Sequence, residues 1–304
     1  MTAAFDPALY PFEGKRFDRG GGIHMHWLDE GPRDAPPVVM VHGNPSWSFY
    51  YRGLVQGLRD RFRCIVPDHV GMGLSDKPSD RDYDHTLERR IDDLERLLDH
   101  AGVTSDVTLV VHDWGGGIGF GWATRRPERV RRLVILNTAA FHLPASKSFP
   151  AALRLTRTPL GAVLVRGANA FARGAVHTCV TRAAMPAAVR RAYLAPYDSW
   201  DARIATLRFV QDIPLDPSDA AYAVVSRTDA GLAAFRQTPA LVCWGMKDYV
   251  FDHHFLEAWE QRMPHAEVHR FEDAGHYVLE DAGEEILSLV NGFLAAHPLA
   301  AAGR

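Results

Sequence analysis

The stretch from Leu109 to Gly121, LVVHDWGGGIGFG, constrains the fold of this 304-residue chain more than any other feature. An apolar run that begins at Val107 predicts a buried strand, and a glycine-rich segment follows it directly. A strand that turns sharply into a helix through small residues, with one reactive side chain at its apex, is a nucleophile elbow. The apex residue here is Asp113. Because Val111 stands where the strict motif has glycine, an aspartate that merely caps a helix is the alternative interpretation.

The composition is that of a globular protein, with 47% hydrophobic residues, 23% charged residues and a formal net charge of −3. The length suits one large α/β domain with an insertion, or two ordinary domains. The near balance of charge gives no electrostatic reason to expect nucleic acid or an anionic membrane as a partner. The N-terminal segment lacks the basic start and apolar core of a signal peptide, and no apolar run of about 18 residues predicts a membrane span.

The three cysteines, Cys64, Cys179 and Cys243, show no CxxC spacing, and two of them lie in apolar, strand-like runs. An odd set of this kind is typical of buried free thiols in a reducing compartment. We therefore expect a cytoplasmic protein.

Short apolar runs alternate with helical patterns along most of the chain. Strands are predicted over residues 22–28, 37–41, 62–66, 107–111, 130–136, 240–244 and 266–271. Helices are predicted over 85–98, with its arginines and aspartates on a solvated face, and over about 284–294. This alternation predicts an α/β fold with a mostly parallel, doubly wound sheet.

Residues 138–227 contain no clear strand and are rich in Ala, Leu and Arg, which predicts a helical cap inserted after the strand near 130–136. The core would then comprise residues 1–137 and 228–304. A cap at this point lies over the strand ends, where ligands bind in such sheets. Its aromatic residues could line an apolar pocket, but any one of them is more often plain core, so none is assigned to the site: Phe149, Phe171, Tyr193, Tyr197, Trp200 and Phe209.

Two other patterns carry little weight. His24 and His26 lie on one side of a predicted strand, but no third ligand stands nearby, so zinc is not expected. Gly71 and Gly73 lack the third glycine and the following helix of a dinucleotide fingerprint. No metal or organic cofactor is predicted.

A nucleophile needs a base, and the base needs a group that orients it. Gly275 and His276 follow the last predicted strand, which is where hydrolase chain order puts the histidine. Asp248 comes soon after the strand that ends at residue 244, and it is the predicted orienting acid. Asp252 is a weaker rival, while Asn137, after the preceding strand, carries no charge.

An aspartate nucleophile needs no deprotonation at neutral pH, so it can attack a saturated carbon that carries a leaving group. The product is an alkyl ester of Asp113, and its hydrolysis requires a water activated by histidine. The side-chain amide of Asn44 and the indole N–H of Trp114 are donors that could hold the departing anion. The backbone N–H groups of the same two residues could form an oxyanion hole.

These residues give the chain a resemblance to the haloalkane dehalogenase branch of the α/β-hydrolase superfamily, over nearly its full length. The resemblance rests on HGNPSW from His42, HDWGG from His112, GMKD ending at Asp248, and the pair GH at 275–276. It implies that Asp113, His276 and Asp248 form a catalytic triad and that Asn44 and Trp114 hold a halide. The position of the acid at Asp248, with Asn137 where another subfamily has glutamate, is similar to that in subfamily three of the haloalkane dehalogenases. Epoxide hydrolases normally have an apolar residue at position 44, and fluoroacetate dehalogenases have arginine at 114.

Longer stretches resemble one group within this branch, the β-lactone decarboxylases of bacterial long-chain olefin biosynthesis. They are LYPFEGKRFDRGGGIHMHWLDEG, HGNPSWSFYYR, PDHVGMGLSDKP and RFVQDIPL. The resemblance implies a cis-3,4-dialkyl β-lactone (oxetan-2-one) substrate, a cis-alkene and carbon dioxide as products, no cofactor, and other olefin-pathway enzymes as partners. A haloalkane dehalogenase is the alternative. An epoxide hydrolase or a non-catalytic ligand receptor is a more distant one.

Overall fold

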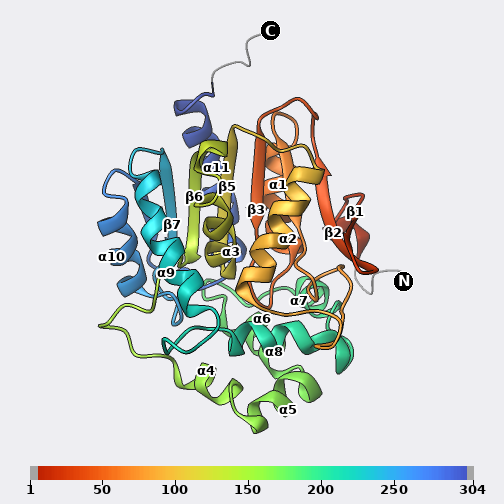
Figure 1. Ribbon diagram of the computed structural model, residues 1–304. Helices are drawn as coiled ribbons and strands as arrows, with labels where there is room; N and C mark the ends of the chain where they lie inside the picture. The colour runs from red at the N-terminus through yellow and green to blue at the C-terminus, as the bar shows by residue number, and fades with distance from the viewer. Residues whose placement is uncertain (1–5, 300–304) are drawn as a thin grey trace.

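A computed structural model describes residues 6–299, which form an eight-stranded sheet covered by helices on both faces (Figure 1). The strand order is β1-β2-β4-β3-β5-β6-β7-β8, with β2 antiparallel to both β1 and β4 and the remaining pairs parallel. The strands are β1 (Lys15–Gly20), β2 (Ile23–Glu30), β3 (Pro37–Val41), β4 (Arg63–Pro67), β5 (Val107–Asp113), β6 (Val130–Thr138), β7 (Ala240–Gly245) and β8 (Glu267–Phe271).

Five helices belong to the sheet layers: α1 (Arg52–Leu58), α2 (Leu87–His100), α3 (Trp114–Ala123), α10 (His253–Arg262) and α11 (Val278–Ala296). Side chains of α2, α3 and α10 share one buried cluster with one face of the sheet, whereas α1 and α11 share the other. The last helix is longer than predicted, with an irregular residue at Ala282 inside it. None of the helices within residues 6–299 combines the length and the apolar character needed to cross a membrane.

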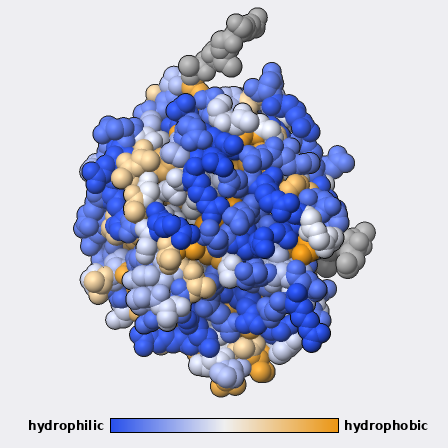
Figure 2. Space-filling view, in the orientation of Figure 1, coloured by the Kyte–Doolittle hydropathy of each residue, from blue (hydrophilic) through white to orange (hydrophobic). Residues whose placement is uncertain are grey.

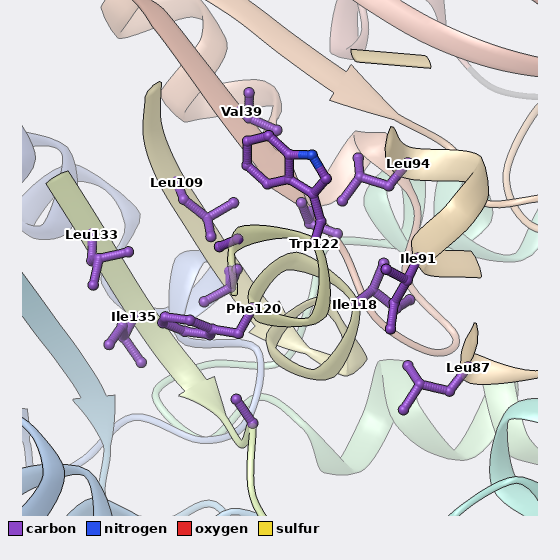
Figure 3. Close-up of a cluster of buried hydrophobic side chains, with 14 of the residues drawn as sticks. Val39, Leu87, Ile91, Leu94, Leu109, Ile118, Phe120, Trp122, Leu133 and Ile135 are labelled. Carbon is purple, nitrogen blue, oxygen red and sulfur yellow. The ribbon is translucent and has the colours of Figure 1, made fainter. Parts of the chain in front are cut away.

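Successive side chains of β5 are buried on opposite faces of the sheet, so helices are needed on both sides. Leu109 and Val111 lie in the cluster under α2 and α3, while Val110 lies in the opposite one. Figure 3 shows Phe120 and Trp122 of α3 pointing from the helix toward side chains of the sheet. All five side chains are fully buried. A glycine-rich helix can therefore be held firmly, because its few large side chains fill the space between sheet and helix.

The charged residues of α2 correct one expectation, because two of them are buried instead of solvated. The guanidinium of Arg90 lies 3.7 Å from the ring centroid of Phe209. The carboxylate of Asp93 accepts hydrogen bonds from Arg19 Nε and the Tyr83 hydroxyl, each at 2.7 Å. Strand β1 and a cap helix cover this side of α2, and both come from distant parts of the chain.

The remaining helices lie between β6 and β7 in the chain: α4 (Ala151–Thr156), α5 (Pro159–Ala168), α6 (Ala170–Thr178), α7 (Ala187–Leu194), α8 (Ile204–Gln211) and α9 (Tyr222–Gly231). Figure 1 shows α4 to α8 beyond the carboxyl ends of the parallel strands, with α4 and α5 farthest from the sheet. Helix α9 runs across position 227/228 and packs on α3. The division into core and cap at 137/138 and 227/228 stays a prediction.

Candidate active site

Asp113 ends β5 and precedes α3, and its backbone is in an unusual conformation with φ 52° and ψ −127°. A non-glycine residue in this region is strained, and such strain is concentrated at functional sites. The side chain does not cap α3. Its Oδ1 atom instead accepts the backbone N–H of Asn44, in the loop after β3, at 2.6 Å. The carboxylate is therefore held away from the helix end and toward that loop.

Two glycines make the turn around Asp113 sterically accessible. A Cβ atom at Gly43 would lie 1.9 Å from Oδ1 of Asp113, and one at Gly115 would lie 1.9 Å from the carbonyl oxygen of Val41. The valine at position 111, where the strict motif has glycine, is accommodated by Gly119. A Cβ there would lie 2.7 Å from Cγ1 of Val111. The sequence thus departs from the strict elbow motif and keeps its geometry.

His276 lies between two carboxylates. Its Nδ1 atom is 2.7 Å from Oδ2 of Asp248, and its Nε2 atom is 3.6 Å from Oδ2 of Asp113. All three side chains are buried. Asp248 and His276 lie in the loops after β7 and β8, and Asp113 is the last residue of β5. The imidazole of His112 contacts the carbonyl oxygen of His276 at 2.8 Å and helps to fix its backbone. Asp113, His276 and Asp248 thus contact one another in the order expected of a nucleophile, a base and an orienting acid, and these three roles stay a prediction.

Asp248 is held by three further donors. Its Oδ1 atom accepts the backbone N–H groups of Val250 at 2.7 Å and Phe251 at 3.1 Å. Its Oδ2 atom accepts Nδ2 of Asn137 at 3.1 Å. Asn137 was set aside in the sequence because it carries no charge. The contact arises because β6 and β7 are neighbours in the sheet, which the chain order alone does not reveal.

Burial raises the pKa of the Asp113 carboxyl above its usual range, although the charge of His276 and two backbone N–H groups oppose this rise. Burial alone would lower the pKa of His276. The adjacent carboxylates of Asp248 and Asp113 outweigh it and raise that pKa above 6.5. Both groups therefore hold a proton up to a higher pH than they would in water.

The two predicted anion donors lie on the same side of the site. Asn44 Nδ2 donates one hydrogen to the carbonyl oxygen of Thr206 in α8 at 3.1 Å, which leaves its second N–H for a ligand. The ring of Trp114 packs edge-on against Phe209, with centroids 5.3 Å apart. Within residues 6–299, no acceptor contacts the indole N–H of Trp114. Helix α8 of the cap thus supports both donors.

Asp113, His276, Asn44 and Trp114 line one end of a cavity of about 410 Å³. The rest of its wall is mostly apolar and comes largely from the segments before and within α4, α5 and α6. Among the aromatic residues considered from the sequence, Phe149 and Phe171 line the cavity. Tyr193, Tyr197 and Phe209 are buried elsewhere, and Trp200 is exposed.

The comparison with protein families matches residues 36–283 to the α/β-hydrolase fold. The chain belongs to this family. The predicted fold class, an α/β-hydrolase fold with a mostly parallel sheet, is thereby confirmed.

Two curated relatives resemble this α/β hydrolase along nearly its whole length. A cis-3-alkyl-4-alkyloxetan-2-one decarboxylase of Shewanella oneidensis is 56% identical, over 94% of this chain and 89% of that protein. One of Xanthomonas campestris is 53% identical, over 95% of this chain and 98% of that protein. Among solved structures, the haloalkane dehalogenase DbeA from Bradyrhizobium elkani has a TM-score of 0.83 at 26% identity, over 94% and 99% of the two chains. The resemblance inferred from the sequence is confirmed.

Other candidate residues of this α/β hydrolase lie outside the cavity. Asp252 caps α10 through the backbone N–H of His254 at 3.1 Å and pairs with Lys147, so it does not contact His276. His24 and His26 contact different carboxylates, those of Asp76 and Asp68. They do not form a shared site.

Proposed function

We propose that this protein opens and decarboxylates cis-3,4-dialkyl β-lactones, giving cis-alkenes and carbon dioxide in olefin biosynthesis. The observation that carries the proposal is the 56% identity to a cis-3-alkyl-4-alkyloxetan-2-one decarboxylase over 94% of the chain. The site adds chemical support, because a buried carboxylate lies at one end of a largely apolar cavity. The two alkyl chains of such a lactone need an apolar wall, and its ring needs the polar groups beside Asp113.

In the first step, Asp113 attacks C4, the saturated ring carbon that is bonded to the ring oxygen. The carbon–oxygen bond breaks with inversion, an alkyl ester of Asp113 forms, and the ring carbonyl becomes a free carboxylate. Asn44 and Trp114 hold this carboxylate with their side-chain N–H groups. The backbone N–H of Asn44, which contacts Oδ1 of Asp113, orients the nucleophile so that Oδ2 is free to attack.

In the second step, the new carboxylate leaves as carbon dioxide. The electrons of its carbon–carbon bond form the alkene, and the bond to Asp113 breaks, which restores the free aspartate. Loss of carbon dioxide anti to the ester, after inversion, preserves the cis geometry. No water is consumed, so His276, oriented by Asp248, supports the charge of Asp113 as an imidazolium instead of activating water.

Haloalkane dehalogenation by the same nucleophile is the second candidate. The likeness to the haloalkane dehalogenase structure and the pair of donors at Asn44 and Trp114 favour it. In that reaction the ester of Asp113 must be hydrolysed, so His276 has to act as the base for a water molecule.

The deciding experiment compares turnover of a cis-dialkyl β-lactone and of 1-bromohexane by the purified protein, following alkene and bromide. We expect cis-alkene from the lactone, only slow bromide release, and loss of both in Asp113→Ala. Asp252→Ala is the matched control, because it removes a nearby carboxylate that does not line the cavity. Brisk bromide release without alkene would identify a dehalogenase. A trans-alkene, or full activity of Asp113→Ala, would refute the scheme.

We further propose that the protein works in the cytoplasm and receives its apolar substrate from other olefin-pathway enzymes. Cys64, Cys179 and Cys243 are all buried and unpaired, which supports a reducing compartment. Their burial raises the pKa of each thiol, so they are poor nucleophiles.

A further inference from the structure

The outer face of the cap exposes large apolar side chains. We call the cap apolar face the set on α4, α5 and the segment before α8 that comprises Leu155, Leu160, Val163, Leu164 and Trp200. Leu160 and Val163 are 63% and 55% exposed, and the other three are also exposed. In Figure 2, hydrophobic surface gathers at the end of the molecule where α5 lies in Figure 1, while much of the same view is hydrophilic. Apolar side chains grouped in this way mark an interaction site.

These residues form one continuous surface. Leu160, Val163, Leu164 and Gly167 recur at the helical spacing of three and four, so they share one face of α5. The ring of Trp200 continues that face, since it would lie 3.7 Å from a Cβ atom placed at Gly167. The face is therefore a stripe along α5 with an aromatic residue at its end.

The same face leads to the cavity. Leu155 and Leu164 are both exposed to solvent and part of the cavity wall. The cap apolar face and the cavity wall therefore share two side chains.

The charge around this face is positive. Residues 138–197 contain no Asp or Glu and eight basic residues: Lys147, Arg154, Arg157, Arg166, Arg173, Arg182, Arg190 and Arg191. Arg154, Arg173 and Arg191 are exposed, and no carboxylate of the described residues lies within ion-pairing distance of them. Two exposed acidic residues flank Trp200, Asp198 and Asp201, and Asp201 pairs with Arg166 at 3.2 Å. The overall net charge of −3 conceals this local excess.

We propose that the cap docks on an anionic lipid surface, with the cap apolar face inserted among the acyl chains and the exposed arginines on the headgroups. Apolar residues with flanking basic residues are the composition of interfacial membrane-binding helices. A second copy of the chain is a poor occupant, because two like-charged segments would repel each other. Docking in this orientation brings Leu155 and Leu164, which belong to both the cap apolar face and the cavity wall, against the acyl chains. Delivery of a long-chain lactone by this route rests on the proposed function, whereas the docking itself does not.

The test is flotation of the full-length protein with vesicles of phosphatidylcholine alone or of phosphatidylcholine with phosphatidylglycerol. We expect binding only to the anionic vesicles, and weaker binding as salt rises. The double variant Arg154→Glu/Arg173→Glu should lose affinity by at least about thirtyfold, and Leu160→Asp/Val163→Asp by at least about tenfold. Circular dichroism and turnover of detergent-dispersed lactone confirm that each variant is folded.

The matched control is Arg131→Glu/Arg236→Glu. It reverses two exposed arginines near the starts of β6 and β7, at the opposite end of the strands from the cap, and should bind as the wild type does. Absence of binding to anionic vesicles at low salt would overturn the proposal, as would equal binding by the cap and control variants. Self-association that the Leu160→Asp/Val163→Asp variant abolishes, without vesicle binding, would overturn it in favour of a second copy. Vesicle binding by a protein inactive on lactone would leave the docking standing and refute only the reaction.

Discussion

Asn137 donates its side-chain N–H to the same Oδ2 atom of Asp248 that contacts Nδ1 of His276. The two oxygen contacts are 3.1 Å and 2.7 Å. The backbone of Asn137 has a positive φ of 25°, and its Oδ1 accepts the N–H of Gly245 at 2.8 Å. An uncharged residue thus links the ends of β6 and β7 and sets the position of the acid.

We expect Asn137→Ala to lower kcat on the lactone by about threefold with little change in KM, because Asp248 loses a donor but the cavity wall is unchanged. Loss of the donor leaves more negative charge facing His276, so the pKa of His276 should rise further. NMR titration of the imidazole nitrogens measures this shift. Unchanged kcat together with an unchanged titration would show that Asn137 has only a structural role.

His276→Gln should separate the two candidate reactions. Decarboxylation needs no activated water, so lactone turnover should fall by no more than about tenfold, whereas hydrolysis of an alkyl ester should fall by about 10²–10⁴. With 1-bromohexane the variant should therefore stall as a hexyl ester of Asp113, seen as added mass on the whole protein. An equal loss on both substrates would contradict a water-free second step.

The two reactions should also differ in pH dependence. Lactone turnover requires ionised Asp113, whose pKa is raised by burial, so activity should fall as pH decreases through a value above 3.8. It should also decline at high pH, above the raised pKa of His276, where the supporting imidazolium is lost. Bromide turnover requires neutral His276 as well, and its raised pKa places that rising limb above pH 6.5. Measuring turnover of each substrate at a series of pH values gives the pH at which each activity rises. A lactone profile that rises only above pH 6.5 would indicate that His276 acts as a base.

Gly43→Ala should impair both activity and stability. The new methyl group would lie 1.9 Å from Oδ1 and 2.4 Å from Cβ of Asp113, and because Cβ cannot rotate away, the backbone must shift and displace the carboxylate. A displacement of about 1 Å lowers turnover about 10²-fold. Gly53→Ala on α1 is the control, since nothing lies within 4 Å of its Cβ position. Comparable turnover of the two variants would show that Gly43 does not constrain the nucleophile.

Asp93→Ala should destabilise the protein by about 3–5 kcal/mol, because it leaves the buried guanidinium of Arg19 without its carboxylate. Asp92→Ala on the same helix removes a half-exposed partner of Arg125 and should cost less than about 1 kcal/mol. Urea unfolding of both variants measures the difference. Similar costs would indicate that the Arg19 guanidinium reaches water or another partner when Asp93 is removed.

The parts that could be predicted are those set by local pattern. Strand ends carry the residues at the centre of the site, and chain order alone suggested Asp113, Asp248 and His276, which the structure brings into contact. The predictions that were wrong or missing depend on contacts between distant segments. Arg90 and Asp93 are buried by β1 and α8, and Asn137 reaches Asp248 because β6 and β7 are neighbours. The average charge likewise gave no indication of the basic segment in the cap.

The two ends of the cavity have different origins in the chain. Asn44, Asp113, Trp114 and His276 are carried by the core at the carboxyl ends of β3, β5 and β8, whereas much of the apolar wall comes from the single insertion between β6 and β7. Chain length and shape of the accepted molecule can therefore diversify in evolution by change within one contiguous stretch while the bond-breaking groups are inherited unaltered. Exchange of the segment between β6 and β7 among relatives would therefore test whether substrate selectivity can change while the reaction stays the same.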